Sequence, residues 1–192
     1  VELGDTSDGA PALCSHNGRL YLAWKGSGND NLNLAFSEDN GATFRGKTTF
    51  AETSSHGPAL TSHGGRLFMA WKGSGNENLN VAKVALFGNT QGGFGIDGLE
   101  AKVVLAEISE EPPALGSQSG MLYLGWKGEG EDHLNLRVSR DGAFRPLGPW
   151  IFSDLGHLGF YVAAYRTPPA LPELLDPVPR SEEHTSELQS RQ

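Results

Sequence analysis

Arg19-Leu20-Tyr21-Leu22-Ala23-Trp24-Lys25-Gly26 is one of three near-copies of a single stretch in this chain of 192 residues. The second copy is Arg66-Leu67-Phe68-Met69-Ala70-Trp71-Lys72-Gly73, and the third is Met121-Leu122-Tyr123-Leu124-Gly125-Trp126-Lys127-Gly128. A Pro-Ala-Leu tripeptide opens each repeat, at Pro11, Pro58 and Pro113, which gives periods of 47 and 55 residues. Self-similarity at such periods indicates an array of similar structural units.

Each repeat predicts four short strands separated by turn residues. Pro-Ala-Leu opens the first strand, and the quoted stretch carries the second. The third strands are expected at 32–36, 79–84 and 134–138, and the fourth at 48–51, 103–106 and 150–152. The extra length of the second period falls in the glycine-rich segment 88–98, where we expect a lengthened surface loop.

The second strand of each repeat is apolar on both faces. Leu20, Leu22 and Trp24 alternate with Tyr21 and Ala23, and successive side chains of a strand point to opposite faces. A four-stranded unit buried on both faces and repeated about every 50 residues is typical of a propeller blade. We therefore predict an all-β fold, a partial β-propeller with three four-stranded blades of about 47–55 residues each, over residues 1–155.

Composition disfavours several classes of partner. The chain has 15 basic and 23 acidic residues, a net charge of -8, which disfavours nucleic acid and anionic membranes as partners. Cys14 is the only cysteine, so we expect neither an internal disulfide nor a thiolate metal site. The histidines share no ligand spacing and are expected at the surface, and no metal or other cofactor is predicted.

Ser37-Glu38-Asp39-Asn40-Gly41-Ala42-Thr43-Phe44 resembles the Asp-box, the bacterial neuraminidase repeat of the sialidase superfamily. Ser139-Arg140-Asp141-Gly142-Ala143-Phe144 is a shortened variant, and the second repeat lacks the motif. The resemblance implies a six-bladed or similar ring and an extracellular location. Residues of this motif are expected to stabilise turns rather than to catalyse; they are Ser37, Asp39, Gly41, Phe44, Ser139, Asp141, Gly142 and Phe144.

The C-terminal part departs from the repeat. Residues 156–179 are expected to be a degenerate or frameshifted start of a fourth blade, and residues 180–190 resemble a translated sequencing adapter. We therefore expect an artefactual, disordered tail over 180–192 and a chain cut from a longer protein. Three blades without ring closure also predict self-association through open blade faces.

The most informative candidate site is the Trp-Lys-Gly end of the second strand with the asparagines that follow it. An aromatic ring beside ammonium and amide groups suits a sugar, whereas a tryptophan in line with two leucines also suits the core between blades. The expected ligand-binding residues are Trp24, Lys25, Asn33, Trp71, Lys72, Asn80, Trp126, Lys127 and Asn135, with no catalytic residue assigned.

Three functions follow from this pattern. Near-identical blades favour non-catalytic binding of glycans or another extended ligand, because repeated sites raise avidity. The first alternative is a fragment of an exo-sialidase-type glycoside hydrolase whose catalytic residues lie in other blades. The second alternative is a structural or protein-binding propeller.

Overall fold

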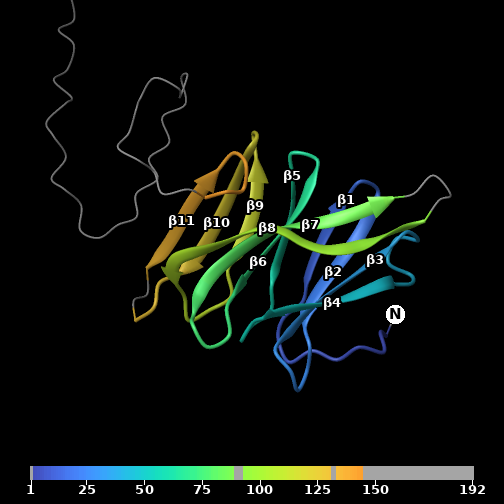
Figure 1. Ribbon diagram of the computed structural model, residues 1–192, viewed down its shortest axis with the longest axis horizontal. Helices are drawn as coiled ribbons and strands as arrows, with labels where there is room; N and C mark the ends of the chain where they lie inside the picture. The colour runs from blue at the N-terminus through green and yellow to red at the C-terminus, as the bar shows by residue number, and fades with distance from the viewer. Residues whose placement is uncertain (1, 89–92, 131–132, 145–192) are drawn as a thin grey trace, which may run out of the picture.

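The computed structural model describes residues 2–88, 93–130 and 133–144. These residues form eleven β-strands, shown in Figure 1. The strands are β1 Ala12–His16, β2 Arg19–Lys25, β3 Asn31–Ser37, β4 Arg45–Thr53, β5 Ala59–His63, β6 Arg66–Lys72, β7 Asn78–Gly88, β8 Phe94–Ile108, β9 Ala114–Gln118, β10 Met121–Lys127 and β11 Leu134–Ser139. The all-β prediction is confirmed.

The strands pair in chain order within three antiparallel sheets. The first sheet is β1-β2-β3-β4, the second is β5-β6-β7-β8, and the third contains β9, β10 and β11. The sheets lie side by side in Figure 1, and the first strands of neighbouring sheets contact one another. The fold is a partial β-propeller with one blade per repeat, and the fourth strand expected at 150–152 lies outside the described residues.

Two hydrophobic cores join the blades, one on each side of the middle sheet. On β6, Leu67, Met69 and Trp71 face the core shared with the first sheet. Phe68 and Ala70, at the alternate positions, face the core shared with the third sheet. Burial on both faces is what the doubly apolar second strand predicted.

Two histidines link consecutive blades, and the expectation that they lie at the surface is wrong. His16 and His63 are buried at the ends of β1 and β5. His16 Nδ1 lies 2.7 Å from Ser62 Oγ, and His63 Nδ1 lies 2.9 Å from Ser117 Oγ in the next blade. The first strands of neighbouring blades are in contact, so the imidazoles are enclosed, and burial lowers the pKa of His16.

The segment expected as a long surface loop is mostly β-structure. Strand β7 continues to Gly88 and β8 begins at Phe94, so the extra residues lengthen a hairpin. The Phe94 ring packs edge-on against Phe36 of the first blade, with centroids 5.0 Å apart, and Thr48 Oγ1 donates to the Ile96 carbonyl at 3.3 Å. These contacts between blades explain why the extension is ordered and why β8 exceeds the expected 103–106.

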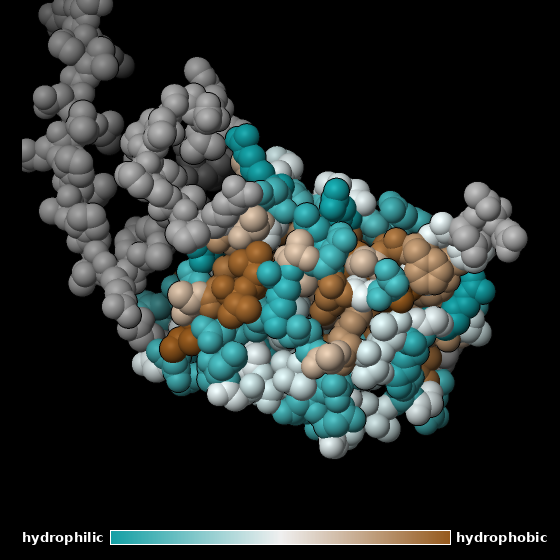
Figure 2. All heavy atoms as spheres, in the orientation of Figure 1, coloured by the Kyte–Doolittle hydropathy of each residue, from teal (hydrophilic) through white to brown (hydrophobic). Residues whose placement is uncertain are grey.

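The surface shown in Figure 2 carries apolar areas separated by polar ones. The large apolar side chains left exposed include Leu13 on β1 and Leu134 and Leu136 on β11. Self-association through blade faces stays a prediction. Across the described part of the chain, no helix is long and apolar enough to cross a membrane.

Candidate functional site

The turn between β3 and β4 is closed by side chains of the Ser37–Phe44 motif. Ser37 Oγ accepts from the Gly41 amide at 2.8 Å and donates to Asp39 Oδ1 at 2.7 Å. Asp39 Oδ1 also accepts from the Thr43 amide at 2.9 Å, and Asp39 Oδ2 accepts from the Thr43 hydroxyl at 2.6 Å. Gly41 has a φ of 85°, a conformation that glycine adopts without strain.

Asp39 is therefore a turn-stabilising carboxylate. The Thr43 hydroxyl, with the Thr43 amide and the Ser37 hydroxyl, lowers the pKa of Asp39 to about 2. A carboxyl group with such a pKa is ionised at neutral pH and holds no proton to donate. Phe44 is half-buried beside this turn.

The shortened motif of the third blade is built in the same way. Ser139 Oγ donates to Asp141 Oδ1 at 3.0 Å and accepts from the Gly142 amide at 3.0 Å. Phe144 is buried in the core that joins the second and third blades, which also contains Phe68. This turn therefore also contributes to packing between blades.

The Trp-Lys-Gly motif lies at the opposite end of each sheet, because adjacent strands are antiparallel. After β2, Asn29 Oδ1 accepts from the Asn31 amide at 3.0 Å, which closes the β2–β3 turn. A Cβ at Gly26 would lie 2.6 Å from Asn29 Oδ1, so a larger residue there would displace the amide. Asn76 closes the turn after β6 in the same way.

The lysines of the motif form ion pairs with acidic residues of the neighbouring loops. Lys25 is buried, and its Nζ lies 2.6 Å from Asp8 Oδ1 and 3.2 Å from Asp30 Oδ1. The hydrogen bond with Asp8, followed by that with Asp30, raises the pKa of Lys25. Lys72 is likewise buried and forms an ion pair with Glu77.

The third lysine of the motif also forms an ion pair with an acidic residue. Lys127 Nζ lies 3.6 Å from Glu110 Oε2. These ion pairs partly neutralise the acidic loops. The described residues hold no cluster of His, Cys, Asp or Glu suited to a metal ion.

The tryptophans occupy two different environments. Trp71 and Trp126 belong to the cores between consecutive blades and are 0% and 9% exposed. Trp24 is 5% exposed and lies on the face of the first sheet that points away from the second blade. Ligand binding by each ring stays a prediction, and Trp24 lines a pocket of the described structure.

A lysine covers each of the first two rings. Lys47 Nζ lies 5.4 Å from the centre of the Trp24 ring and forms an ion pair with Asp5. Lys102 Nζ lies 5.6 Å from the centre of the Trp71 ring and 2.5 Å from Glu52 Oε2. The same cation–aromatic arrangement therefore recurs in both blades.

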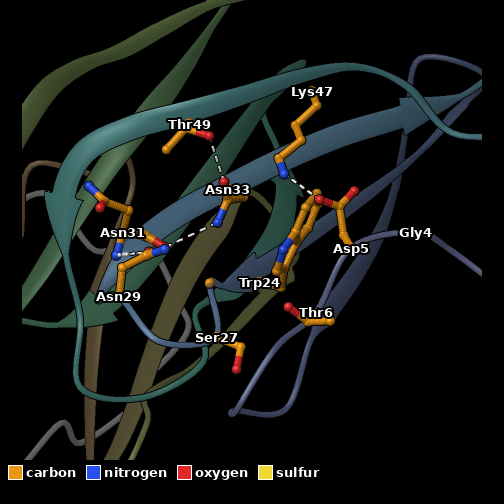
Figure 3. A pocket seen from close by; sticks show the side chains of 11 residues that line it. Gly4, Asp5, Thr6, Trp24, Ser27, Asn29, Asn31, Asn33, Lys47 and Thr49 are labelled. Carbon is orange, nitrogen blue, oxygen red and sulfur yellow. Dashed lines mark hydrogen bonds and ion pairs between the residues drawn. The ribbon is translucent and has the colours of Figure 1, made fainter.

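The pocket beside Trp24 has a volume of about 240 Å³ and is shown in Figure 3. Strands β2, β3 and β4 supply three of its walls, and the N-terminal segment with Asp5 and Thr6 supplies the fourth. Its lining residues are mostly polar; they are Gly4, Asp5, Thr6, Trp24, Gly26, Ser27, Asn29, Asn31, Asn33, Lys47 and Thr49.

Much of the amide capacity at the back of the pocket is used internally. Thr49 Oγ1 donates to Asn33 Oδ1 at 2.7 Å, and Asn33 Nδ2 donates to the Asn31 carbonyl at 3.1 Å. Asn31 Nδ2 donates in turn to the Phe50 carbonyl at 3.0 Å, which ties β3 to β4. The asparagines thus fix one wall of the pocket, and the rest of the lining adds hydroxyl and charged side chains.

The structure brings together only part of the predicted site. Trp24 and Asn33 line the pocket, whereas Lys25 does not. Asn135 Nδ2 donates to the His133 carbonyl at 3.4 Å in the third blade. Sequence reasoning missed Asp5, Lys47 and Thr49 as lining residues. A signal for Asp5 was available, because an acidic residue lies six positions before each Pro-Ala-Leu, at 5, 52 and 107.

Comparison with known proteins gives similarity to sialidase structures. No protein-family model matches the chain, and no curated protein matches its sequence. The Hadza microbial sialidase Hz136 aligns with a TM-score of 0.42 at 15% identity, over 70% of this chain and 32% of the sialidase. A Trypanosoma rangeli sialidase in complex with the inhibitor DANA aligns with a TM-score of 0.36 at 12% identity, over 71% of this chain and 37% of the sialidase. The chain thus spans about a third of each of these proteins.

Proposed function

We propose that this chain is a non-catalytic ligand-binding segment of a β-propeller and that the pocket beside Trp24 binds a saccharide. The observation that carries the proposal is the composition of that pocket. It combines an indole ring with hydroxyl, amide and charged groups in a concave site. Saccharide hydroxyls donate and accept, and this lining offers partners of both kinds.

The charges of the pocket favour a neutral ligand. Lys47 and Asp5 are the two charged residues of the lining, and they form an ion pair with each other. The pocket therefore presents no uncompensated charge from these two groups. A neutral polyhydroxylated ligand can accept from the ammonium group and donate to the carboxylate without breaking this balance.

The carboxyl content of the pocket favours binding over hydrolysis. Most glycoside hydrolases use two carboxyl groups that flank the bond to be broken. Among the described residues that line this pocket, Asp5 is the single carboxylate, and it is paired with Lys47. The pocket as built therefore supports retention of a sugar rather than acid–base chemistry upon it.

A glycan array probed with the full chain tests the proposal. Thr49 is exposed on β4, so Thr49→Lys is expected to fold and to fill the pocket with a long side chain. Ala51→Lys is the matched control, because Ala51 is also exposed on β4 but is not among the lining residues.

Binding of the original chain to one or more glycans, lost in Thr49→Lys and kept in Ala51→Lys, is the expected result. Equal binding by the two variants would show that the glycan binds outside this pocket. Release of the fluorophore from a fluorogenic sialoside by the purified chain would overturn the non-catalytic assignment in favour of the glycoside hydrolase.

A further inference from the structure

The first and third sheets expose complementary halves of a core that the molecule builds twice. They lie on opposite sides of the middle sheet in Figure 1. Each core between blades combines the third strand of one blade with the first and second strands of the next blade. Among the described residues, the third sheet therefore keeps one face of the first kind, and the first sheet keeps one face of the second kind.

The third-blade face is defined by Leu134 and Leu136 on β11. By strand register Leu134 is equivalent to Leu32, and it is 89% exposed whereas Leu32 is 0% exposed. Leu136 is equivalent to Leu34, and it is 49% exposed whereas Leu34 is fully buried. The equivalent residues of the second blade are buried against the third blade. This face therefore has the composition of a blade face that receives a following blade.

The first-blade face is defined by Leu13 on β1 and Leu22 on β2. By strand register Leu13 is equivalent to Leu60, and it is 59% exposed whereas Leu60 is 8% exposed. Leu22 is half-buried, whereas its equivalent Met69 is fully buried in the core between the first two blades. This face therefore has the composition of a blade face that packs against a preceding blade.

The inner strands supply polar groups for the same pairing. In the junction between the first two blades, His16 Nδ1 lies 2.7 Å from Ser62 Oγ, and the next junction repeats this contact. Gln118 holds the histidine position in the third blade, and Ser15 holds the serine position in the first blade. Both residues are exposed. Since a glutamine amide donates and accepts, Gln118 of one copy can bond with Ser15 of another.

We propose that the third-blade face docks on the first-blade face of a second copy of this chain, so that two copies close one ring of blades. A head-to-tail contact closes a ring if its rotation allows, and otherwise continues as a filament. Each copy supplies three sheets. Propellers typically have about four to eight blades, and two copies give the one multiple of three in that range.

Docking of a second copy and binding of a saccharide are expected to exclude each other. Trp71, the second-blade counterpart of Trp24, is fully buried in the core formed with the preceding sheet. A second copy on the first-blade face would enclose Trp24 in the same way. The saccharide is therefore expected to bind the monomer, and the dimer rests on the blade faces and not on the proposed function.

Sedimentation velocity of the full chain over a range of concentrations tests the dimer. The expected result is a reversible rise from 20.5 kDa to twice that mass. Leu134→Glu and Leu13→Glu should both be monomers, because each places a carboxylate in both junctions of the ring. Both positions are exposed in the single chain, so both variants are expected to fold. Val104→Glu is the matched control, since Val104 is exposed on β8 outside both faces, and it should still dimerise.

An equimolar mixture of Leu134→Glu and Leu13→Glu tests the head-to-tail arrangement. In a mixed pair one junction consists of two unchanged faces, so the mixture should recover a dimer that is weaker than that of the original chain. A dimer kept by Leu13→Glu and lost by Leu134→Glu would overturn the arrangement in favour of pairing between two third-blade faces. An original chain that stays monomeric at every concentration, or that grows into filaments, would overturn the closed ring.

Discussion

The first and second blades carry the same Trp-Lys-Gly motif in two different settings. Trp71 is enclosed between two sheets, whereas Trp24 lies on the face of the first sheet that points away from the second blade, beside a polar pocket. The lysines, by contrast, are buried and ion-paired in both blades. The motif therefore stabilises each blade through the buried tryptophan and the ion-paired lysine. Whether a ligand can reach the tryptophan depends on whether a second sheet packs against its ring.

The largest expected effect separates the two rings. Trp71→Ala should lower the free energy of unfolding by about 3–5 kcal/mol, because it empties a fully buried site in the core between blades. Trp24→Ala should cost less, since that ring borders a polar pocket rather than a second sheet within the described residues. Chemical denaturation of both variants measures the difference, and equal losses would contradict the contrast between the blades.

The two lysines are expected to behave alike. Lys25→Met and Lys72→Met each remove a buried ammonium group from its acidic partners, so both should lower the melting temperature by a few degrees. Thermal unfolding followed by circular dichroism measures the shifts. A Lys25→Met variant that melts normally but loses glycan binding would instead assign Lys25 to the site.

Acid should lower the free energy of unfolding of the first blade by protonating Asp39 in the β3–β4 turn. The pKa of Asp39 is about 2 in the folded chain and 3.8 as the ordinary value, so its stabilisation is complete above 3.8 and is lost as the pH falls toward 2. The lowered pKa values of Asp8 and Asp30 act in the same direction. The raised pKa of Lys25 acts at the other end of the scale, because its stabilisation is lost only as the pH rises above 10.5.

Denaturation of the original chain, Asp39→Asn and Asp97→Asn between pH 2 and 5 measures this contribution. Asp97 is exposed on β8 and serves as the control. The Asp39→Asn variant should be less stable at pH 5 and depend less steeply on pH than the other two. Parallel curves for all three proteins would show that the carboxylate does not stabilise the turn.

The smallest effect is expected at two equivalent positions of the outer strands, Thr49 on β4 and Val104 on β8. Val104→Thr adds a hydroxyl at an exposed position and Thr49→Val removes one hydrogen bond to Asn33, so each should change the free energy of unfolding by no more than about 1 kcal/mol. Urea denaturation checks this value. A loss of several kcal/mol in either variant would contradict a minor role of these side chains in folding.

The sequence predicted the repeated strands because their signals are local. Alternating apolar residues and turn glycines sufficed to place β1, β2, β5, β6, β9 and β10 close to their observed bounds. Contacts between blades left no such signal: neither the pairing of His16 with Ser62 nor the packing of Phe94 on Phe36 follows from local periodicity. The pocket was only half predicted for the same reason, since Asp5 and Lys47 reach Trp24 from distant parts of the chain.

The most direct test of the central claim is an NMR titration of the full chain, labelled with ¹⁵N at its four tryptophans, with the glycan that binds best on the array. The account predicts a saturable shift of the indole N–H signal of Trp24, which lines the pocket, while the signal of Trp126, buried between the second and third blades, stays in place. A shift at Trp126 with none at Trp24 would contradict a saccharide site in the first blade.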